Sequence, residues 1–360
     1  MMVRDIGTDD PRVRVRAGKS SRPRTKNRPN WTTKPLGRVI GIDRGRYRVI
    51  LDEASVEVQA VRAKELGRGS IIMGDHVRLT GDLSGRVDTL ARIVAVEERA
   101  TVLRRSLEDA ADQKGEKAIV ANAQVMCIVV ALADPPPRTG MIDRCLVAAF
   151  EAGLEPLLCL TKADLASPDE LIEAYRDFDV RVVVTNLGGA DDSLSPGNDG
   201  VDAIRELLAG RFSVLVGHSG VGKSTLINAL VPHAHRAVGH VNEVTGRGRH
   251  TSTSSQAFEL PTGGWIVDTP GVRSFGLGHV SVDDVLGVFP DVADATQWCL
   301  PLCTHLPDEV SCALDTWRTG GTPFEAIDED EAERRSHRVE SARRLLDAVA
   351  TAEAVSKAAR

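Results

Sequence analysis

Nine consecutive residues carry the clearest chemical signal in the chain. They run Gly217-His218-Ser219-Gly220-Val221-Gly222-Lys223-Ser224-Thr225 and satisfy the pattern G-x-x-x-x-G-K-[ST]. In such a loop the backbone N–H groups surround phosphate oxygens, the lysine reaches the β- and γ-phosphates, and the hydroxyl that follows binds Mg²⁺. We therefore predict a nucleoside triphosphate site in which Lys223 supplies charge for catalysis and Ser224 is a magnesium ligand.

Two shorter motifs select the nucleotide and sense its γ-phosphate. Thr161-Lys162-Ala163-Asp164 fits a T/N-K-x-D element, whose aspartate accepts two hydrogen bonds from guanine that adenine cannot donate. Asp268-Thr269-Pro270-Gly271 fits D-x-x-G, the element that senses γ-phosphate and Mg²⁺. We expect GTP and GDP as ligands, bound by Thr161, Lys162, Ala163 and Asp164 at the base and by Asp268 and Gly271 near the phosphates. Thr185-Asn186 takes the place of the loop that closes over the base.

The order of these motifs is unusual. GTPases commonly present the phosphate loop first, then D-x-x-G, then the base-reading element, whereas here the base-reading element comes first. Each motif follows an apolar run, and in a parallel α/β sheet the carboxyl ends of strands meet at one edge. The pattern predicts a circularly permuted P-loop GTPase.

A basic, hydroxyl-rich stretch at 246–253 separates the phosphate loop from D-x-x-G, as a switch segment would. Thr251 or Ser252 is expected to bind Mg²⁺, and Thr251 is the preferred choice. Val272 stands where many GTPases hold a glutamine that orients water, which predicts slow intrinsic hydrolysis. His250 is a candidate to position that water, although it can equally contact RNA or stay solvated.

Four soft or borderline metal ligands crowd into fourteen residues near the C-terminus, namely Cys299, Cys303, His305 and Cys312. A Cys₃His set with no open position is typical of structural Zn²⁺. We predict one structural zinc per chain. Cys127, Cys145 and Cys159 lie in apolar runs and are expected to be buried thiols.

The remaining pattern divides the chain into parts. Residues 1–35 are Arg-, Pro- and Ser-rich and predict a disordered basic tail. Five short alternating segments in 36–105 predict a small β-barrel of the OB type that binds RNA, although an SH3-like barrel would show the same periodicity. Alternating strand and helix patterns in 106–278 predict the GTPase domain, a mostly parallel sheet with helices on both faces. Residues 279–360 predict the zinc knuckle at 299–312 between helical patterns at 284–298 and 323–360. The fold class is therefore multidomain α/β.

The charge distribution and the hydropathy of the chain limit which kinds of partner it can bind. Residues 1–105 hold 23 Lys and Arg against 13 Asp and Glu, whereas 106–360 hold 22 against 38. The basic front end suggests a polyanionic partner. No signal peptide or apolar run of membrane-spanning length is seen, so we expect a cytoplasmic protein with no membrane contact. Nothing in the sequence requires more than a monomer.

A barrel, a permuted GTPase and a Cys₃His knuckle, in this order, resemble the ribosome small-subunit-dependent GTPase A family (RsgA, also called YjeQ) over about residues 36–345. The matching stretches are 121–124, 217–228, 246–251, 268–273 and the four metal ligands. The resemblance implies a factor in late maturation of the 30S ribosomal subunit that binds near the decoding region of 16S rRNA. It further implies GTP hydrolysis on stimulation by the subunit, followed by dissociation.

Two other functions fit parts of the sequence. Val272 leaves open an RNA-binding assembly scaffold whose nucleotide acts as a switch with negligible turnover. A P-loop ATPase or kinase is the third alternative, which Asp164 disfavours.

Overall fold

The computed structural model describes residues 30–67, 69–106, 116–178, 180–186, 199–231, 255–269, 277 and 280–358. Most of the predicted basic tail therefore lies outside the described residues. The chain from Lys34 onward groups as one unit, separate from Met1–Thr33. No helix within the described ranges combines the length and the apolar character needed to cross a membrane.

Five strands near the N-terminus form a closed barrel, as predicted. They are β1 (Leu36–Asp43), β2 (Arg46–Leu51), β3 (Glu57–Arg62), β4 (His76–Gly81) and β5 (Ala91–Val96). Their order is β1-β2-β3-β5-β4, and pairing of β1 with β4 closes the ring. Alternate residues such as Val39, Val49, Leu79 and Ile93 are fully buried inside it, because successive side chains of a strand point to opposite faces.

A short hairpin that the sequence pattern did not predict follows the barrel. It pairs β6 (Val102–Ser106) with β7 (Glu116–Ala121). Leu103, Val120 and Ala121 are buried, whereas Arg104 and Lys117 are exposed, and neither strand alternates between apolar and polar residues. The expected boundary between barrel and GTPase, at 105/106, falls within β6, and the division into domains stays a prediction.

The central region is built on a second set of strands. These are β8 (Val125–Ala131), β9 (Glu155–Thr161), β10 (Arg181–Val184), β11 (Phe212–Val216), β12 (Ser255–Glu259) and β13 (Trp265–Asp268). Their order is β10-β9-β8-β11-β13-β12, and only β12 runs antiparallel to its neighbour within this set. β12 also pairs with β1, so the sheet continues into the barrel.

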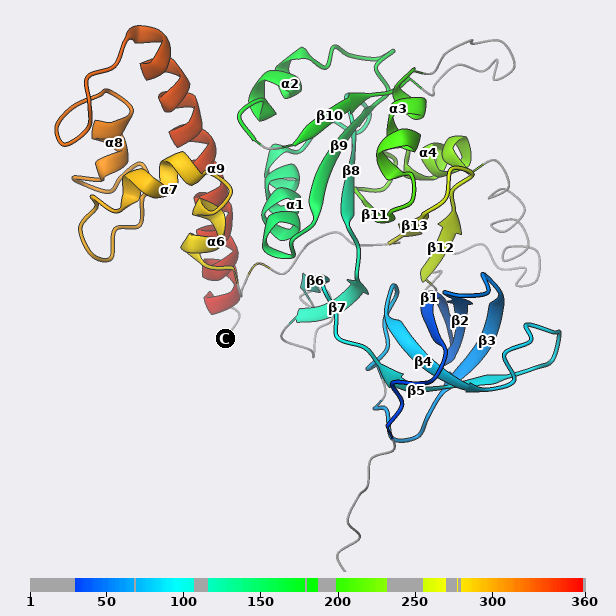
Figure 1. Ribbon diagram of the computed structural model, residues 1–360. Coiled ribbons are helices and arrows are strands. Elements are labelled where there is room, and N and C mark those ends of the chain that lie inside the picture. The colour runs from blue at the N-terminus through cyan, green and yellow to red at the C-terminus, as the bar shows by residue number, and fades with distance from the viewer. Residues whose placement is uncertain are drawn as a thin grey trace, which may run out of the picture. The chain divides into compact units, whose positions relative to one another are not determined.

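Helices cover both faces of this sheet, as predicted (Figure 1). Alternate residues of β8 separate into two apolar clusters. Met126 and Ile128 pack in the cluster that contains residues of α1 (Thr139–Glu151) and α2 (Asp169–Tyr175). Cys127 and Val129 pack in the cluster with α3 (Asp199–Leu208) and α4 (Lys223–Leu230).

The C-terminal region is helical around an irregular loop. The helix expected over 284–298 is two helices, α6 (Val282–Leu286) and α7 (Pro290–Thr296), because Gly287 ends the first and Pro290 begins the second. α8 (Ala313–Trp317) was not predicted. The helix expected from 323 is α9 (Glu329–Ala358), and it begins later because the Asp328 carboxylate caps its first turn by accepting the Glu331 N–H at 2.8 Å.

Candidate nucleotide site and metal centre

Three predicted nucleotide motifs meet at one edge of the central sheet. The phosphate loop joins β11 to α4, Thr161 ends β9, and Asp268 ends β13. These strands are linked by parallel pairings through β8 and β11. Because parallel strands bring their carboxyl ends together, residues distant in sequence share one site.

The phosphate loop needs its glycines for close packing. Gly217 has φ +150°, and a Cβ there would lie 2.4 Å from the Val129 carbonyl oxygen. Gly222, at φ +95°, is in the left-handed region immediately before α4. Ser224 and Thr225 lie in the first turn of this helix and are exposed. The unpaired N–H groups of this turn are therefore available to phosphate.

The Lys223 ammonium is folded onto its own loop. Its Nζ donates to the carbonyl oxygens of Gly217 at 2.6 Å and His218 at 2.7 Å. Burial lowers the pKa of Lys223, and the Asp268 carboxylate opposes that shift. A phosphate seated in the loop would give this partly buried charge a stronger acceptor than two neutral carbonyls.

Asp268 is the acidic group of the site. Burial raises its pKa, and the charge of Lys223 opposes the rise. Its Oδ1 is buried and has no hydrogen-bond partner among the described residues, although such atoms normally find one. A hydrated cation beside Asp268 would satisfy both its charge and this oxygen, so the residues fit Mg²⁺.

The base-reading element is tied directly to the phosphate loop. Thr161 is buried, and its Oγ1 donates to the Val221 carbonyl oxygen at 2.6 Å. Lys162 adopts φ +60°, and the exposed side chain of Asp164 is accessible to a base. The Ala163 N–H donates to the Thr185 carbonyl oxygen at 3.4 Å, so Thr185 lies beside this element.

A loop after β8 is a part of the site that the sequence analysis missed. The Asp134 carbonyl accepts a hydrogen bond from Lys162 Nζ. Pro135 Cδ would lie 3.7 Å from a Cβ on Gly220. The run Asp134-Pro135-Pro136-Pro137 at the end of a buried strand was the available signal. The predicted contributions of His250, Thr251, Ser252 and Gly271 lie outside the described residues.

The four predicted metal ligands converge. Their donor atoms all lie within 4.8 Å of one another. The His305 Nδ1 is 3.5 Å from Cys299 Sγ and 3.7 Å from Cys312 Sγ, and the two sulfurs are 3.9 Å apart. A tetrahedral Zn²⁺ with ordinary bond lengths sets ligand atoms roughly 3.6–3.8 Å apart, so this cluster can hold a metal and its dimensions suit zinc.

Arginines of α9 connect this cluster to the GTPase region. Arg343 donates to the His305 carbonyl oxygen at 3.0 Å and forms two bonds of 2.9 Å with the Asp315 carboxylate. The next residue, Arg344, is paired with Asp143 of α1 at 3.2 Å and lies over the Tyr175 ring. One helix therefore positions the metal loop and packs on the sheet's helical layer.

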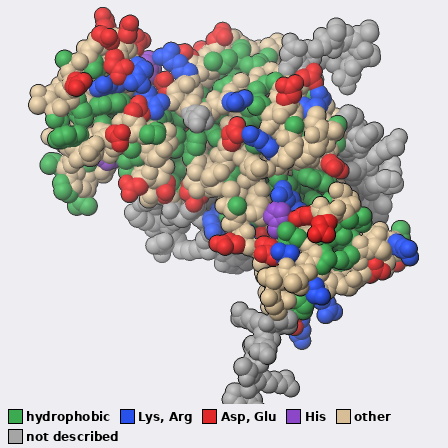
Figure 2. All heavy atoms as spheres, in the orientation of Figure 1, with side chains coloured by type: hydrophobic (Ala, Val, Ile, Leu, Met, Phe, Trp, Pro, Cys, Tyr) green, Lys and Arg blue, Asp and Glu red, His purple; other side chains and the backbone are tan. Residues whose placement is uncertain are grey.

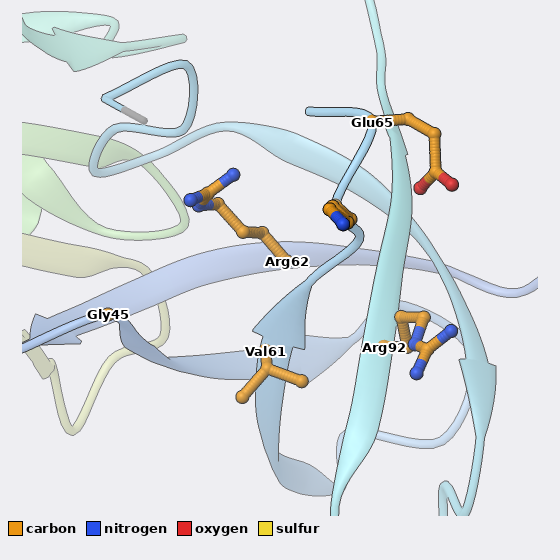
Figure 3. A pocket seen from close by; sticks show the side chains of 6 residues that line it. Gly45, Val61, Arg62, Glu65 and Arg92 are labelled. Atoms are coloured by element: carbon orange, nitrogen blue, oxygen red, sulfur yellow. The ribbon is translucent and has the colours of Figure 1, made fainter. Parts of the chain in front are cut away.

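The barrel carries a separate pocket of about 630 Å³, lined by residues of the paired strands β3 and β5, of the segment after β3 and of the turn before β2. Its lining includes Arg62, Lys64 and Arg92, together with Glu65 (Figure 3). Arg62 is held by donation to the Leu66 carbonyl, whereas Lys64 and Arg92 are exposed. Three cations beside one carboxylate favour an anionic ligand such as a nucleic-acid phosphate.

The sheet order, the phosphate loop and the upstream base-reading element together define a circularly permuted P-loop GTPase. Residues 96–278 match the family model described as RsgA GTPase. The chain belongs to the RsgA GTPase family, and the resemblance drawn from its motifs is confirmed.

Relatives and solved structures agree with this assignment. The chain is 36% identical over 277 residues to "Small ribosomal subunit biogenesis GTPase RsgA" of Pseudomonas syringae pv. tomato, covering 72% of this chain and 75% of the relative. The protein of that name from Pseudomonas putida is 38% identical over 253 residues, 68% of each chain.

Two crystal structures share the fold. YjeQ from Thermotoga maritima superposes with a TM-score of 0.58 and 25% identity, covering 85% of this chain and 97% of that one. YloQ, described as a circularly permuted GTPase, gives 0.57 with 21% identity, covering 88% and 97%. Both confirm the predicted fold class.

Proposed function

We propose that this chain hydrolyses GTP in the late biogenesis of the small ribosomal subunit, is stimulated by the 30S particle and then dissociates. The observation that carries the proposal is the convergence of Thr161–Asp164, Gly217–Thr225 and Asp268 at one sheet edge. Family membership supports GTP hydrolysis, and the names of the relatives in two Pseudomonas species support the small subunit as the target.

The residues of the nucleotide site have separate roles. Asp164 accepts from the guanine, the amides of 217–225 surround the phosphates, and Lys223 leaves its loop carbonyls for the β- and γ-phosphates. Ser224 and Thr251 hold Mg²⁺, with Asp268 beside it. When bound, the ion neutralises charge on the phosphate oxygens. His250 positions the attacking water in the place of the glutamine that Val272 does not supply.

The barrel and the metal knuckle, which flank the GTPase region, have roles at the small ribosomal subunit. The barrel binds 16S rRNA through phosphate contacts at the pocket of Arg62, Lys64 and Arg92. The four-ligand cluster holds one structural Zn²⁺ that fixes the knuckle against α9. The protein acts as a monomer in the cytoplasm, where the small subunit is its partner.

A second candidate is a nucleotide-switched RNA-binding scaffold with negligible turnover, which the absence of glutamine at Val272 favours. Single-turnover hydrolysis of bound GTP, with and without 30S subunits, separates the two. The proposed function predicts rapid conversion to GDP when 30S is added. If GTP stays intact after the chain binds 30S, the result would favour the scaffold function.

Nucleotide selectivity tests the base-reading assignment. Asp164→Asn should weaken GDP binding strongly while Asp169→Asn, a nearby exposed acid at the start of α2, should not. Competition of GTP and ATP against labelled GDP measures the effect. Equal affinity of GTP and ATP for the wild-type chain would contradict the assignment.

A further inference from the structure

The metal knuckle exposes an unusual amount of apolar side chain. Leu302 is 98% exposed, Val310 84%, Leu300 68% and Trp298 59%. Leu300 and Leu302 lie between ligands Cys299 and Cys303, and Val310 lies between His305 and Cys312. The two loops therefore carry their apolar residues to the same metal cluster. We call Trp298, Leu300, Leu302 and Val310 the knuckle patch.

The backbone at Leu302, the most exposed residue of the knuckle patch, is in an uncommon conformation. Leu302 adopts φ +69°, in a left-handed conformation that is unfavourable for a leucine. Conformations of this kind persist where the surrounding structure enforces them, and here the neighbouring ligand Cys303 is drawn to the cluster. Exposed apolar groups gathered on a soluble protein mark interaction surfaces.

Charge around the knuckle patch selects the partner. Residues 281–330 contain eleven Asp and Glu and a single basic residue, Arg318. Asp308 and Glu309 directly precede Val310, and Glu325 follows Phe324, whose ring lies edge-on to the Trp298 ring at 6.4 Å. Arg318 is engaged with Asp315 at 3.5 Å.

Figure 2 shows the same composition in space. Hydrophobic side chains gather at the margin of the molecule where α7 and α8 lie, with acidic side chains beside them and basic side chains nearby. This surface is unlike one that binds nucleic acid, because its carboxylates outnumber its cations and neighbouring arginines of α9 are already engaged, Arg338 with Asp291 and Arg343 with Asp315.

We propose that the knuckle patch docks a cationic protein segment that presents Lys or Arg beside apolar anchors. The apolar anchors pack on Trp298, Leu300, Leu302 and Val310, and the cations meet the surrounding carboxylates. Applied to the ribosomal particle this inference rests on the proposed function, since it then places the segment on a small-subunit protein rather than on rRNA.

The first test uses a labelled synthetic peptide of alternating Lys and Leu, with an alternating Glu and Leu peptide as control. Anisotropy with the full-length, metal-loaded chain should show binding of the Lys peptide alone. Leu300→Ser combined with Leu302→Ser should weaken it about tenfold. Val87→Ser, which alters a barrel side chain that is 89% exposed, should change nothing. Affinity unchanged in the double variant overturns the proposal.

Measuring the metal content of each variant shows whether a loss of peptide binding comes from misfolding of the knuckle. Each variant should retain one metal ion per chain, and Val310→Ser, in the other ligand loop, gives a second measurement if the double variant loses its metal. Val310→Ser with full metal content and undiminished peptide binding would also overturn the proposal.

The second test places a benzophenone side chain at position 302 and irradiates the chain with purified 30S subunits. The proposal expects a crosslink that survives RNase and maps to a Lys- or Arg-rich peptide. An RNase-sensitive crosslink would show an RNA contact and overturn it. If the peptide binds as expected but the chain does not cosediment with 30S, the proposed function fails while the docking surface stands.

Discussion

The barrel and the metal knuckle reach their folds by different physical means. Inside the barrel, apolar side chains from all five strands are buried, including Val39, Val49 and Ile93. In the ligand segment 299–312 only His305 and Cys312 are buried, and both are metal ligands. A segment folded by ligands does not need its apolar residues inside, so they remain available for a partner.

The same two regions differ in charge. Residues 36–105 hold thirteen Lys and Arg against ten Asp and Glu, whereas 281–330 hold one against eleven. If both proposals hold, one chain offers the small ribosomal subunit two unlike surfaces, one for rRNA phosphates and one for a cationic protein segment.

The largest effect should follow loss of a metal ligand. Cys312→Ser should abolish stoichiometric zinc and remove hydrogen-exchange protection from 299–317, because a structural zinc contributes on the order of 10 kcal/mol to folding its segment. Protection of the barrel should not change. Mass spectrometry of metal content and hydrogen exchange measures both.

Cys145→Ala is the matched control, since Cys145 is a buried thiol outside the knuckle. It should keep the metal. Retention of one zinc and full protection in Cys312→Ser would show that the knuckle is held by packing, and the contrast with the barrel would fail.

A smaller effect should follow the loss of a buried charge in the barrel. The Asp75 carboxylate is fully buried and accepts from Arg99 at 2.7 and 2.9 Å and from the Ile72 N–H at 2.8 Å. Asp75→Ala should lower the free energy of unfolding by about 3 kcal/mol, since it leaves a partly buried guanidinium unpaired. Zinc content should not change.

Denaturant titration followed by barrel hydrogen exchange measures this loss. Asp82→Ala, in the exposed loop after β4, is the control. It loses only an exposed hydrogen bond from the Ser84 N–H at 2.9 Å and should have a much smaller effect. Equal stability of the Asp75 and Asp82 variants would show that the barrel does not depend on this pair.

The smallest effect concerns the barrel surface. Replacing Arg62, Lys64 and Arg92 together by Gln should reduce the slope of log K against log salt for rRNA binding by about two, because each phosphate contact contributes roughly 0.7–0.9. Arg334→Gln, in acidic surroundings on α9, should leave the slope as it was. The knuckle patch variants should also leave it unchanged; a slope altered equally by both regions would erase the contrast.

Much of this molecule was predictable because local patterns and function coincide. The barrel strands alternate between apolar and polar residues. Helix α4 begins at Lys223, within the phosphate-loop motif, as that motif requires. Residue type and spacing alone predicted the cluster of Cys299, Cys303, His305 and Cys312 that can hold a metal. These signals are contained within short segments of sequence.

What the sequence did not reveal depends on contacts between distant segments. The Thr161 hydroxyl bonding to the Val221 carbonyl joins residues sixty positions apart. The barrel pocket combines Arg62 and Arg92 through the pairing of β3 with β5. The unpartnered Asp268 oxygen is a property of packing. The apolar residues of the β6–β7 hairpin stand in uninterrupted runs and show no alternation with polar residues.

We propose that one nucleotide site, assembled from permuted motifs, turns over GTP on the small subunit. Steady-state GTP hydrolysis by the purified chain, alone and with 30S, 50S or 70S particles, tests it most directly, with Lys223→Ala as control. We expect strong stimulation by 30S alone that disappears in the variant. Tight GDP binding without stimulation by any particle would contradict the account.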